Sequence, residues 1–292
     1  MREPNDIASY SALACIAIQS NQNDQHGGQS IPNFDYALAD GVRKTYIKKY
    51  YDAIRKGLAM SQLNLSDDKI DEIIDEIKEA TQPFVPSLDW TTEEAREYAR
   101  KELDVLFKHY YSAKHLQEVT RKEAEKDTER ATYQAMEALV HNLNTMNSRA
   151  GSQVPFSSIN YGTDTSIEGR MVIRNILLAT EAGLGNSETP IFPIQIFKVK
   201  EGINYNEGDP NYDLFKLSCR VSAKRLFPNY SFIDAPFNLP YYKEGDYRTE
   251  VGYMGCRTRV MGNVHDPNQE ITTGRGNLSF TSINLPRIAL LA

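Results

Sequence analysis

The second half of the sequence alternates between strand-like and helix-like segments, and this order restricts the possible folds more than any other feature. Residues 153–162 form a polar loop that runs into a strand, residues 165–182 carry a helical apolar pattern that ends at Gly183, and residues 191–199 form an apolar strand. A further strand-like piece begins at Ser231. Before it, residues 209–213 cap a helix whose predicted apolar stripe is Leu214, Leu217, Val221 and Leu226. Because parallel neighbouring strands need crossover connections, the alternation predicts an α/β fold with at least partly parallel strands.

The first half of the chain is predicted to be helical almost throughout, from residue 35 to residue 146. Residues 5–20 fit either a helix or a buried strand by periodicity, and the proline and aspartate near their start favour the helix. Ser66 begins a short helix whose isoleucines at positions 70, 73, 74 and 77 form one apolar stripe. Thr91 and Glu94 form a capping box that begins a much longer, highly charged helix.

Composition and charge exclude several classes of protein. The 292 residues are 40% apolar and 25% charged, which suits one large or two ordinary globular domains. The net charge of -6 argues against a nucleic-acid partner held by a basic surface, although a few local arginines can still bind nucleotides. No apolar run of about 18 residues and no signal-peptide pattern occurs, so we expect no membrane partner and a cytoplasmic location.

Cysteines and histidines show no metal-binding spacing. Cys15, Cys219 and Cys256 lie far apart without a Cys-x-x-Cys pair, which disfavours both a zinc ribbon and a disulfide framework. We interpret Cys15 as a small buried hydrophobe and Cys219 as a packing residue of an amphipathic helix. The remaining candidates share no spacing with a carboxylate or cysteine cluster and are interpreted as surface or packing residues: His109, His115 and His141.

Residues 22–30 (QNDQHGGQS) form a loop of amides with one histidine and a glycine pair that permits unusual backbone angles. This loop fits two hypotheses equally well on its residues alone. It either contacts a nucleotide or another subunit, or it is a polar turn between helices.

Residues 252–260 (GYMGCRTRV) carry the third cysteine in a segment that is too polar and too rich in glycine for an ordinary core strand. The segment is predicted to form a tight loop that presents the sulfur of Cys256. Residues 278–283 then form a strand-like run, and Pro286 either stops that strand or begins a helix at Arg287. The residues alone leave open whether Cys256 is reactive or an inert buried thiol.

Several motifs in the same order carry a resemblance to a known family. They are residues 2–9 (REPNDIAS) with 22–30, residues 144–158 (NTMNSRAGSQVPFSS), residues 202–213 (GINYNEGDPNYD), and the final group 254–257 (MGCR), 274–277 (GRGN) and 282–290 (SINLPRIAL). Together they resemble the anaerobic (class III) ribonucleoside-triphosphate reductases, which are glycyl-radical enzymes. The resemblance spans nearly the whole chain. Other glycyl-radical enzymes, such as pyruvate formate-lyase, also carry a loop cysteine but usually lack the 282–290 pattern and the Gln-His-Gly-Gly loop.

The resemblance implies a partial ten-stranded α/β barrel of two parallel half-sheets, with the cysteine loop threaded through its centre. It implies that residues 1–292 are an internal fragment of the catalytic barrel domain. Residues 1–142 would be the mainly helical region that forms dimer and effector contacts, and residues 143–292 would alternate strand and helix, with the finger loop near 252–260. A regulatory cone, a second cysteine, a zinc-binding tail and the glycyl-radical segment would lie outside the fragment.

The resemblance also implies the chemistry of Cys256. As a thiyl radical it would remove the hydrogen atom from carbon 3′ of the ribose of a ribonucleoside triphosphate and return it at the end of the cycle, which requires a closed, dry cavity. Asn277 would hydrogen-bond the ribose hydroxyls or formate. Alternatively, Asn277 is only a turn residue beside Gly276. The overall reaction that the resemblance implies is reduction of a ribonucleoside triphosphate to its 2′-deoxy form.

The implied cofactors and partners belong to the full-length family. They are a glycyl radical, zinc, formate or a thiol as reductant, ATP and deoxyribonucleoside triphosphates as effectors, a radical-SAM activating enzyme and a second copy in a homodimer. A second hypothesis is that the fragment is catalytically inactive and retains only dimerisation or nucleotide binding, since a divided barrel exposes strand edges.

Overall fold

A computed structural model describes residues 3–25, 27–61, 65–149, 151–255, 258–262, 266, 272–276 and 281–292. Its centre is a sheet of the strands β1 (Gln29–Ile31), β2 (Ser157–Tyr161), β3 (Ile194–Val199) and β4 (Asn229–Phe232), in the order β1-β2-β3-β4. Each neighbouring pair of these strands is parallel. The predicted α/β fold with parallel strands is therefore confirmed.

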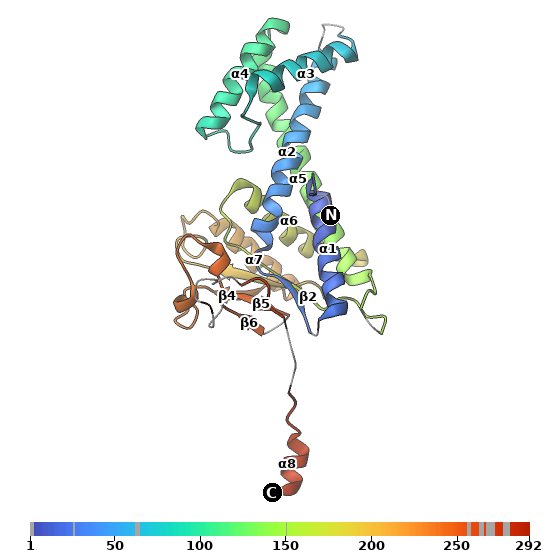
Figure 1. Ribbon diagram of the computed structural model, residues 1–292, viewed down its shortest axis with the longest axis vertical. Helices are drawn as coiled ribbons and strands as arrows, with labels where there is room; N and C mark the ends of the chain where they lie inside the picture. Colours follow the sequence, from blue (N-terminus) through green and yellow to red (C-terminus); the bar gives the residue numbers. More distant parts are fainter. Residues whose placement is uncertain are drawn as a thin grey trace.

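One face of this sheet is covered by α1 (Ile7–Asp24), α6 (Ile167–Ala182), α7 (Tyr212–Arg225) and parts of α2 (Phe34–Ala59) and α5 (Ala113–Thr145) (Figure 1). Alternate strand residues, including Ile159, Tyr161, Phe197 and Val199, point into this helical layer and are buried in it. Because side chains alternate along a strand, their neighbours must occupy the opposite face. That second face carries Ser158, Asn160 and Lys198, together with Ile194 and Ile196.

A helical projection extends away from the sheet (Figure 1). It consists of α3 (Asp67–Thr81), α4 (Glu93–His109) and the adjoining halves of α2 and α5, which pass through both hydrophobic clusters of the protein. The side chain of Ser66 caps α3 as predicted, accepting the N–H of Lys69. The predicted stripe is also confirmed, since all four isoleucines of α3 are buried: Ile70, Ile73, Ile74 and Ile77.

The structure corrects the predicted long helix of the first half. Its cap is Thr92, whose side chain accepts the N–H of Ala95, while Thr91 bonds Asp89 instead. The helix then ends at His109, and α5 begins at Ala113 after Tyr110 adopts an extended conformation. The turn contains neither glycine nor proline, and the charged pattern continues across it, so no local signal marked the break.

Two packing predictions in α7 are also wrong. The buried positions of α7 are Leu214, Ser218, Val221 and Arg225, which lie on one helical face. Cys219 is exposed, because it follows Ser218 by one residue and is rotated off that face. Leu226, predicted as part of the apolar stripe, is the left-handed C-cap and is 81% exposed.

The last part of the described chain contains an antiparallel hairpin of β5 (Gly252–Met254) and β6 (Thr258–Val260), where a loop over residues 252–260 was predicted. Residues 281–283 are irregular, so the described part of the run predicted as strand from 278 to 283 is not a strand. Helix α8 (Leu285–Leu291) carries Pro286 in its first turn, which confirms that this proline begins a helix. Short 3₁₀ helices occur at Gly185–Ser187, Leu239–Tyr241 and Tyr247–Thr249. Among the described helices, none combines the length and apolar character that a bilayer crossing requires.

Candidate active site

The face of the sheet away from the helices carries several polar side chains, most of them buried. Its strand residues include Ser30, Ser158, Asn160, Lys198 and Ser231, and the side chains of Asn160 and Lys198 are fully buried. We call this set the inner face. Charged and amide side chains are rarely buried unless they are paired, so each needs a partner within the structure. Most of those partners belong to the segment that leads into the β5–β6 hairpin and to the hairpin itself.

The hairpin is bound to the inner face through the backbone of Tyr253. Asn160 donates its Nδ2 to the Tyr253 carbonyl at 2.9 Å and accepts the Tyr253 N–H on its Oδ1 at 2.8 Å. Ser30 Oγ donates to the same carbonyl at 2.7 Å, and Ser158 Oγ accepts the N–H of Gly255 at 2.9 Å. Side chains from two neighbouring strands thus fix the position of the residues that precede Cys256.

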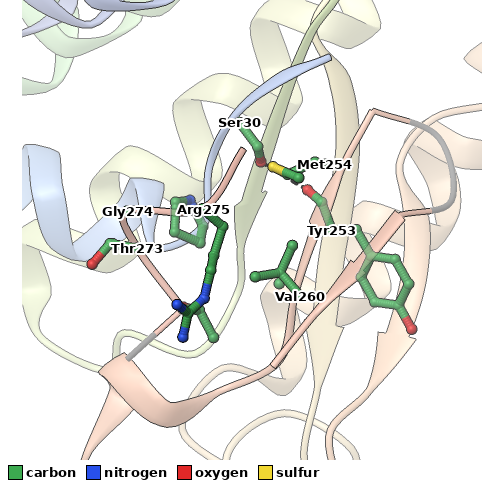
Figure 2. A pocket seen from close by; sticks show the side chains of 10 residues that line it. Ser30, Tyr253, Met254, Val260, Thr273, Gly274 and Arg275 are labelled. Atoms are coloured by element: carbon green, nitrogen blue, oxygen red, sulfur yellow. Dashed lines mark hydrogen bonds between the residues drawn. The ribbon is translucent and has the colours of Figure 1, made fainter. Parts of the chain in front are cut away.

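A small cavity of ≈ 90 Å³ lies beside this contact (Figure 2). Its lining comes from Ser30 and Pro32, from the hairpin residues 252–254 and Val260, and from residues 272–275. In Figure 2, Thr273 and Arg275 lie on the side of the cavity away from the ring of Tyr253. The segment that leads to position 277 therefore lies next to the hairpin.

Three of the motif segments converge at Gly255. A Cβ atom added to Gly28 would lie 2.9 Å from the Cα of Gly255 and 2.8 Å from the ring of Phe156. Gly255 itself has a φ of 60°, and a Cβ atom there would lie 2.7 Å from the same ring. Gly276 lies similarly close to the side chain of Gln25, with only 2.5 Å between an added Cβ atom and Oε1. The loop 22–30 thus packs against both segments that carry the predicted site residues.

Replacing Gly255 by alanine is expected to lower the free energy of unfolding by about 2–4 kcal/mol, because left-handed backbone costs an L-residue about 1–2 kcal/mol and the methyl group would overlap Phe156. Urea denaturation measures the loss. The matched control is Gly245→Ala, since Gly245 has a φ of 79° with open space around its Cα. Equal losses in the two variants would show that contact with Phe156 is unimportant.

A buried ion pair lies at the carboxyl end of β3. Lys198 Nζ donates to Glu250 Oε2 at 2.9 Å and to Asn33 Oδ1 at 2.7 Å, and both charged side chains are 2% exposed or less. The hydroxyl of Thr163 also donates to Glu250 Oε2, at 2.8 Å. Glu250 lies two residues before β5. The ion pair of Lys198 and Glu250 therefore fixes the start of β5, as Asn160 fixes its centre.

The loop after β2 is held by side chains from distant segments. Asp35 Oδ2 accepts the N–H groups of Gly162, Thr163 and Asp164 at 2.8, 3.1 and 3.1 Å. Asn204 and Asn211, both from the motif at residues 202–213, donate to the carbonyl of Gly162. This motif therefore supports the carboxyl ends of the strands, the edge where α/β proteins generally bind ligands.

Asp164 lies in this loop and is 5% exposed. Burial raises the pKa of its carboxyl group to about 6, and the charge of Asp35 adds to the increase, while hydrogen bonds from Ser166 oppose it. An aspartate in an unfolded chain titrates near 3.9. The folded chain therefore binds this proton more tightly, and ionisation of Asp164 opposes folding.

The free energy of unfolding is accordingly expected to fall as the pH rises from about 4 to about 6, by up to about 3 kcal/mol from this group. Asp164→Asn should remove that dependence, since an amide does not titrate and keeps an oxygen for the N–H of Ser166. Denaturation of both proteins between about pH 4 and pH 7 measures the difference. Parallel stability curves for the two proteins would refute the assignment.

The two predicted catalytic residues, Cys256 and Asn277, lie outside the described residues. The described residues nearest to Cys256 in the sequence are Gly255 and Thr258, and the one nearest to Asn277 is Gly276. Met254 pairs with Thr258 across the hairpin. Cys15 is buried as predicted, and burial raises the pKa of its thiol to about 11. Within the described part of the chain, no group of three or more histidine, cysteine, aspartate and glutamate side chains could hold a metal ion.

Five residues that hold the hairpin were not predicted from the sequence: Ser30, Ser158, Asn160, Lys198 and Glu250. A weak sequence signal exists for the three that lie in β2 and β3, namely Ser158, Asn160 and Lys198. In residues 157–161 (SSINY) and 194–199 (IQIFKV), polar side chains occur in short strands whose other residues are buried and apolar. A buried strand that retains serine, asparagine or lysine on one face indicates a polar contact on that face.

Comparison with known proteins places these features in a family. A family model described as anaerobic ribonucleoside-triphosphate reductase matches residues 1–292. The enzyme of that name from Enterobacteria phage T4 is 35% identical over 288 residues, which cover 98% of this chain and 37% of the relative. Those from Escherichia coli and Haemophilus influenzae are each 36% identical, over 55% and 56% of this chain and 22% of each relative. The chain thus spans less than two-fifths of the length of these relatives. The chain belongs to the anaerobic ribonucleoside-triphosphate reductase family.

Proposed function

We propose that this chain supplies the cysteine hairpin and part of the substrate chamber for the anaerobic reduction of ribonucleoside triphosphates to 2′-deoxyribonucleoside triphosphates, as part of a longer enzyme. The observation that supports it best is the polar inner face, which holds the centre of β5 through Asn160 and the segment that leads into β5 through Lys198. A hairpin fixed in this way is suited to carry one reactive side chain at a constant position.

In this proposal Cys256 abstracts the hydrogen atom from carbon 3′ of the ribose and returns it at the end of the cycle. Asn277 hydrogen-bonds the ribose hydroxyls or a formate molecule. The glycyl radical of the family supplies the oxidising equivalent for the cysteine. The described residues have a supporting role: Gly28, Phe156 and Gly255 pack closely against one another directly before Cys256.

The finer architecture is part of the same proposal. The four parallel strands would form part of a ten-stranded α/β barrel with the β5–β6 hairpin inside it. Residues 1–292 would be a fragment of the barrel domain, in which the mainly helical residues 1–142 form dimer and effector contacts, with ATP and deoxyribonucleoside triphosphates as effectors, and residues 143–292 alternate strand and helix. The helical projection, which lies within residues 1–142, has a hydrophobic cluster of its own, whereas α1 and β1 pack with the sheet.

A second candidate function is dimerisation or nucleotide binding without catalysis. It is favoured by one observation, namely that the helical projection has a hydrophobic cluster of its own, apart from the cluster under the sheet. Under this hypothesis the helical projection keeps its role, whereas Cys256 and the inner face are no longer used for chemistry.

Anaerobic turnover and nucleotide binding together decide between the two functions. The activated enzyme is expected to form deoxyribonucleotide from a ribonucleoside triphosphate, and Cys256→Ala is expected to abolish turnover while leaving calorimetric nucleotide binding unchanged. Binding and dimerisation by light scattering without any turnover would support the second function. Absence of both turnover and nucleotide binding would overturn both.

A further inference from the structure

We propose that Asn160 is a positioning residue that sets the register of the Cys256 hairpin on the sheet. This proposal deepens the proposed function and rests on it for the chemical role of Cys256. The hydrogen bonds that carry it are a property of the described chain and can be tested without catalysis.

The side chain of Asn160 replaces a neighbouring strand for β5. In an antiparallel pair, alternate residues bond across to the partner strand, and those between them direct their polar groups outward. Tyr253 lies opposite Arg259 in β6, but its polar groups point away from β6. Its N–H and its carbonyl both bond the side-chain amide of Asn160, at 2.8 and 2.9 Å. The carboxamide presents one donor and one acceptor on the same side, as the N–H and C=O of a single residue in an extended strand do. Asn160 thus pairs with one residue of the hairpin only.

The pairing excludes a shift of the hairpin. A slip by one residue moves a strand by about 3.3 Å and turns its side chains to the other face. After such a slip, Ser158 would lose the N–H of Gly255, which it now accepts at 2.9 Å. The close approach of Gly28 to Gly255 would also be lost, because only a glycine fits there. Radical transfer between a sulfur and a carbon requires placement of the reacting atoms to within about 1 Å.

The bonds of Asn160 favour positioning over direct contact with a substrate. Besides the bond to Tyr253, Nδ2 donates to Ser30 Oγ at 3.1 Å, so both amide hydrogens are used within the protein. Oδ1 already accepts the N–H of Tyr253. Ser30 in turn donates its hydroxyl hydrogen to the Tyr253 carbonyl. The donors of Asn160 are therefore used at the hairpin and at Ser30, which itself donates to the hairpin.

Amide hydrogen exchange on the full chain tests the proposal. Asn160→Leu keeps the size of the side chain and removes its polar atoms, so exchange at Tyr253 should accelerate about tenfold or more, since its N–H loses its acceptor. Gly255 should follow, because Ser158 alone would hold it. Amides of α6 and α7 should keep their wild-type protection, which separates release of the hairpin from global destabilisation.

Asn160→Asp provides a rescue that a purely structural role would not give. A protonated carboxyl group can both donate to the Tyr253 carbonyl and accept its N–H, whereas the ionised group can only accept. Protection factors at Tyr253, taken relative to wild type at the same pH, are expected to be near wild type at about pH 4 and at least about threefold lower at about pH 8. Using wild type as the reference at each pH cancels the titration of other groups, Asp164 included.

Asn144→Leu is the matched control. Asn144 makes the same kind of two-sided contact with the segment before β3 and not with the hairpin: its Oδ1 accepts the N–H groups of Ile191 and Phe192, and its Nδ2 donates to the Phe192 carbonyl. This variant should loosen residues 191 and 192 and leave Tyr253 protected. Unchanged exchange at Tyr253 in Asn160→Leu, or equal loosening of the hairpin in Asn144→Leu, would overturn the proposal.

Activity separates this inference from the function on which it rests. In the activated enzyme, Asn160→Leu should lower kcat about tenfold or more while calorimetric nucleotide affinity stays near wild type. Wild-type enzyme without any turnover would count against the proposed function and leave the exchange result intact. Wild-type turnover with full activity in Asn160→Leu would overturn the positioning role alone.

Discussion

Replacing Glu250 by alanine is expected to lower the free energy of unfolding by about 3–5 kcal/mol, the cost of leaving one member of a buried ion pair without its partner. The side chain of Lys198 is fully buried, and its ammonium group donates to Glu250 and to Asn33. In the variant, Asn33 would remain as its acceptor of these two. Thr163 would lose its acceptor as well. Urea denaturation of wild type and variant at neutral pH measures the loss.

Two further variants identify the cause of that loss. Glu118→Ala removes a carboxylate that pairs with Lys122 at the surface, where both side chains are more than half exposed, and it should lower the free energy of unfolding far less than Glu250→Ala does. The double variant Lys198→Met with Glu250→Leu removes both buried charges and is expected to regain most of the stability, since apolar side chains of similar size replace buried ion pairs well. A double variant as unstable as Glu250→Ala would mean that lost hydrogen bonds, and not an unpaired charge, dominate.

The parts of the fold that could be predicted from the sequence depend on local patterns. The parallel strands followed from the alternation of strand and helix after residue 153, and α3 followed from Ser66 and its stripe of isoleucines. These signals lie within one element, and the physical causes are a cap and an apolar face. The short β1 strand was missed, because its residues Gln29–Ile31 follow an amide-rich loop and are too few for a period to be seen.

The parts that could not be predicted depend on contacts between distant segments. Asn160 and Tyr253 are 93 residues apart, and Asp35 and Gly162 are 127 residues apart. No spacing within the sequence indicates that such residues meet. The family resemblance located the cysteine segment but not the residues that hold it. Those residues are polar side chains of the strands, and their role can be recognised only when the hairpin is seen to pack on the inner face. Burial of a polar side chain, which decides its importance, is a property of the packed structure.

The loop 22–30 illustrates how the structure narrows an open question. Its residues fitted a polar turn and a ligand-contacting loop equally well. Gln22 is buried, donates to the Gly27 carbonyl and accepts the N–H of Phe156, so the loop is firmly fixed to the segment before β2. Gly28 then touches Gly255. The loop is thus a wall of the hairpin site, which gives its glycine pair a physical reason independent of any ligand.

Replacing Asp35 by alanine is the second change with a large expected effect, a loss of about 3–5 kcal/mol in the free energy of unfolding. Asp35 is fully buried in the first turn of α2, and its Oδ2 accepts three successive N–H groups of the loop after β2. Alanine would leave these buried donors without an acceptor, at about 1–3 kcal/mol for each that water cannot reach. Denaturation with urea again measures the change.

Asp35→Asn and Asp209→Ala serve as controls for this loss. Asparagine keeps an acceptor oxygen for the three N–H groups but carries no charge. Its amide nitrogen would take the place of Oδ1, which has no hydrogen-bond partner among the described residues. We therefore expect a loss of stability between those of wild type and Asp35→Ala. Asp209 accepts one exposed N–H, from Asn206, and its replacement should cost under about 1 kcal/mol. A loss in Asp35→Ala no larger than in Asp209→Ala would contradict the prediction.

The same loop connects Asp35 to the hairpin, and this connection makes the two large effects interdependent. Thr163 gives its backbone N–H to Asp35 and its hydroxyl to Glu250. Once Asp35→Ala has released the loop, Thr163 no longer holds Glu250 in a fixed place, so removal of Glu250 should cost less than it does in wild type. The double variant Asp35→Ala with Glu250→Ala is expected to be more stable than the sum of the single losses predicts, by about 0.5–3 kcal/mol. Strict additivity would mean that the strand ends and the hairpin are held independently, and that the inner face is not one cooperative unit.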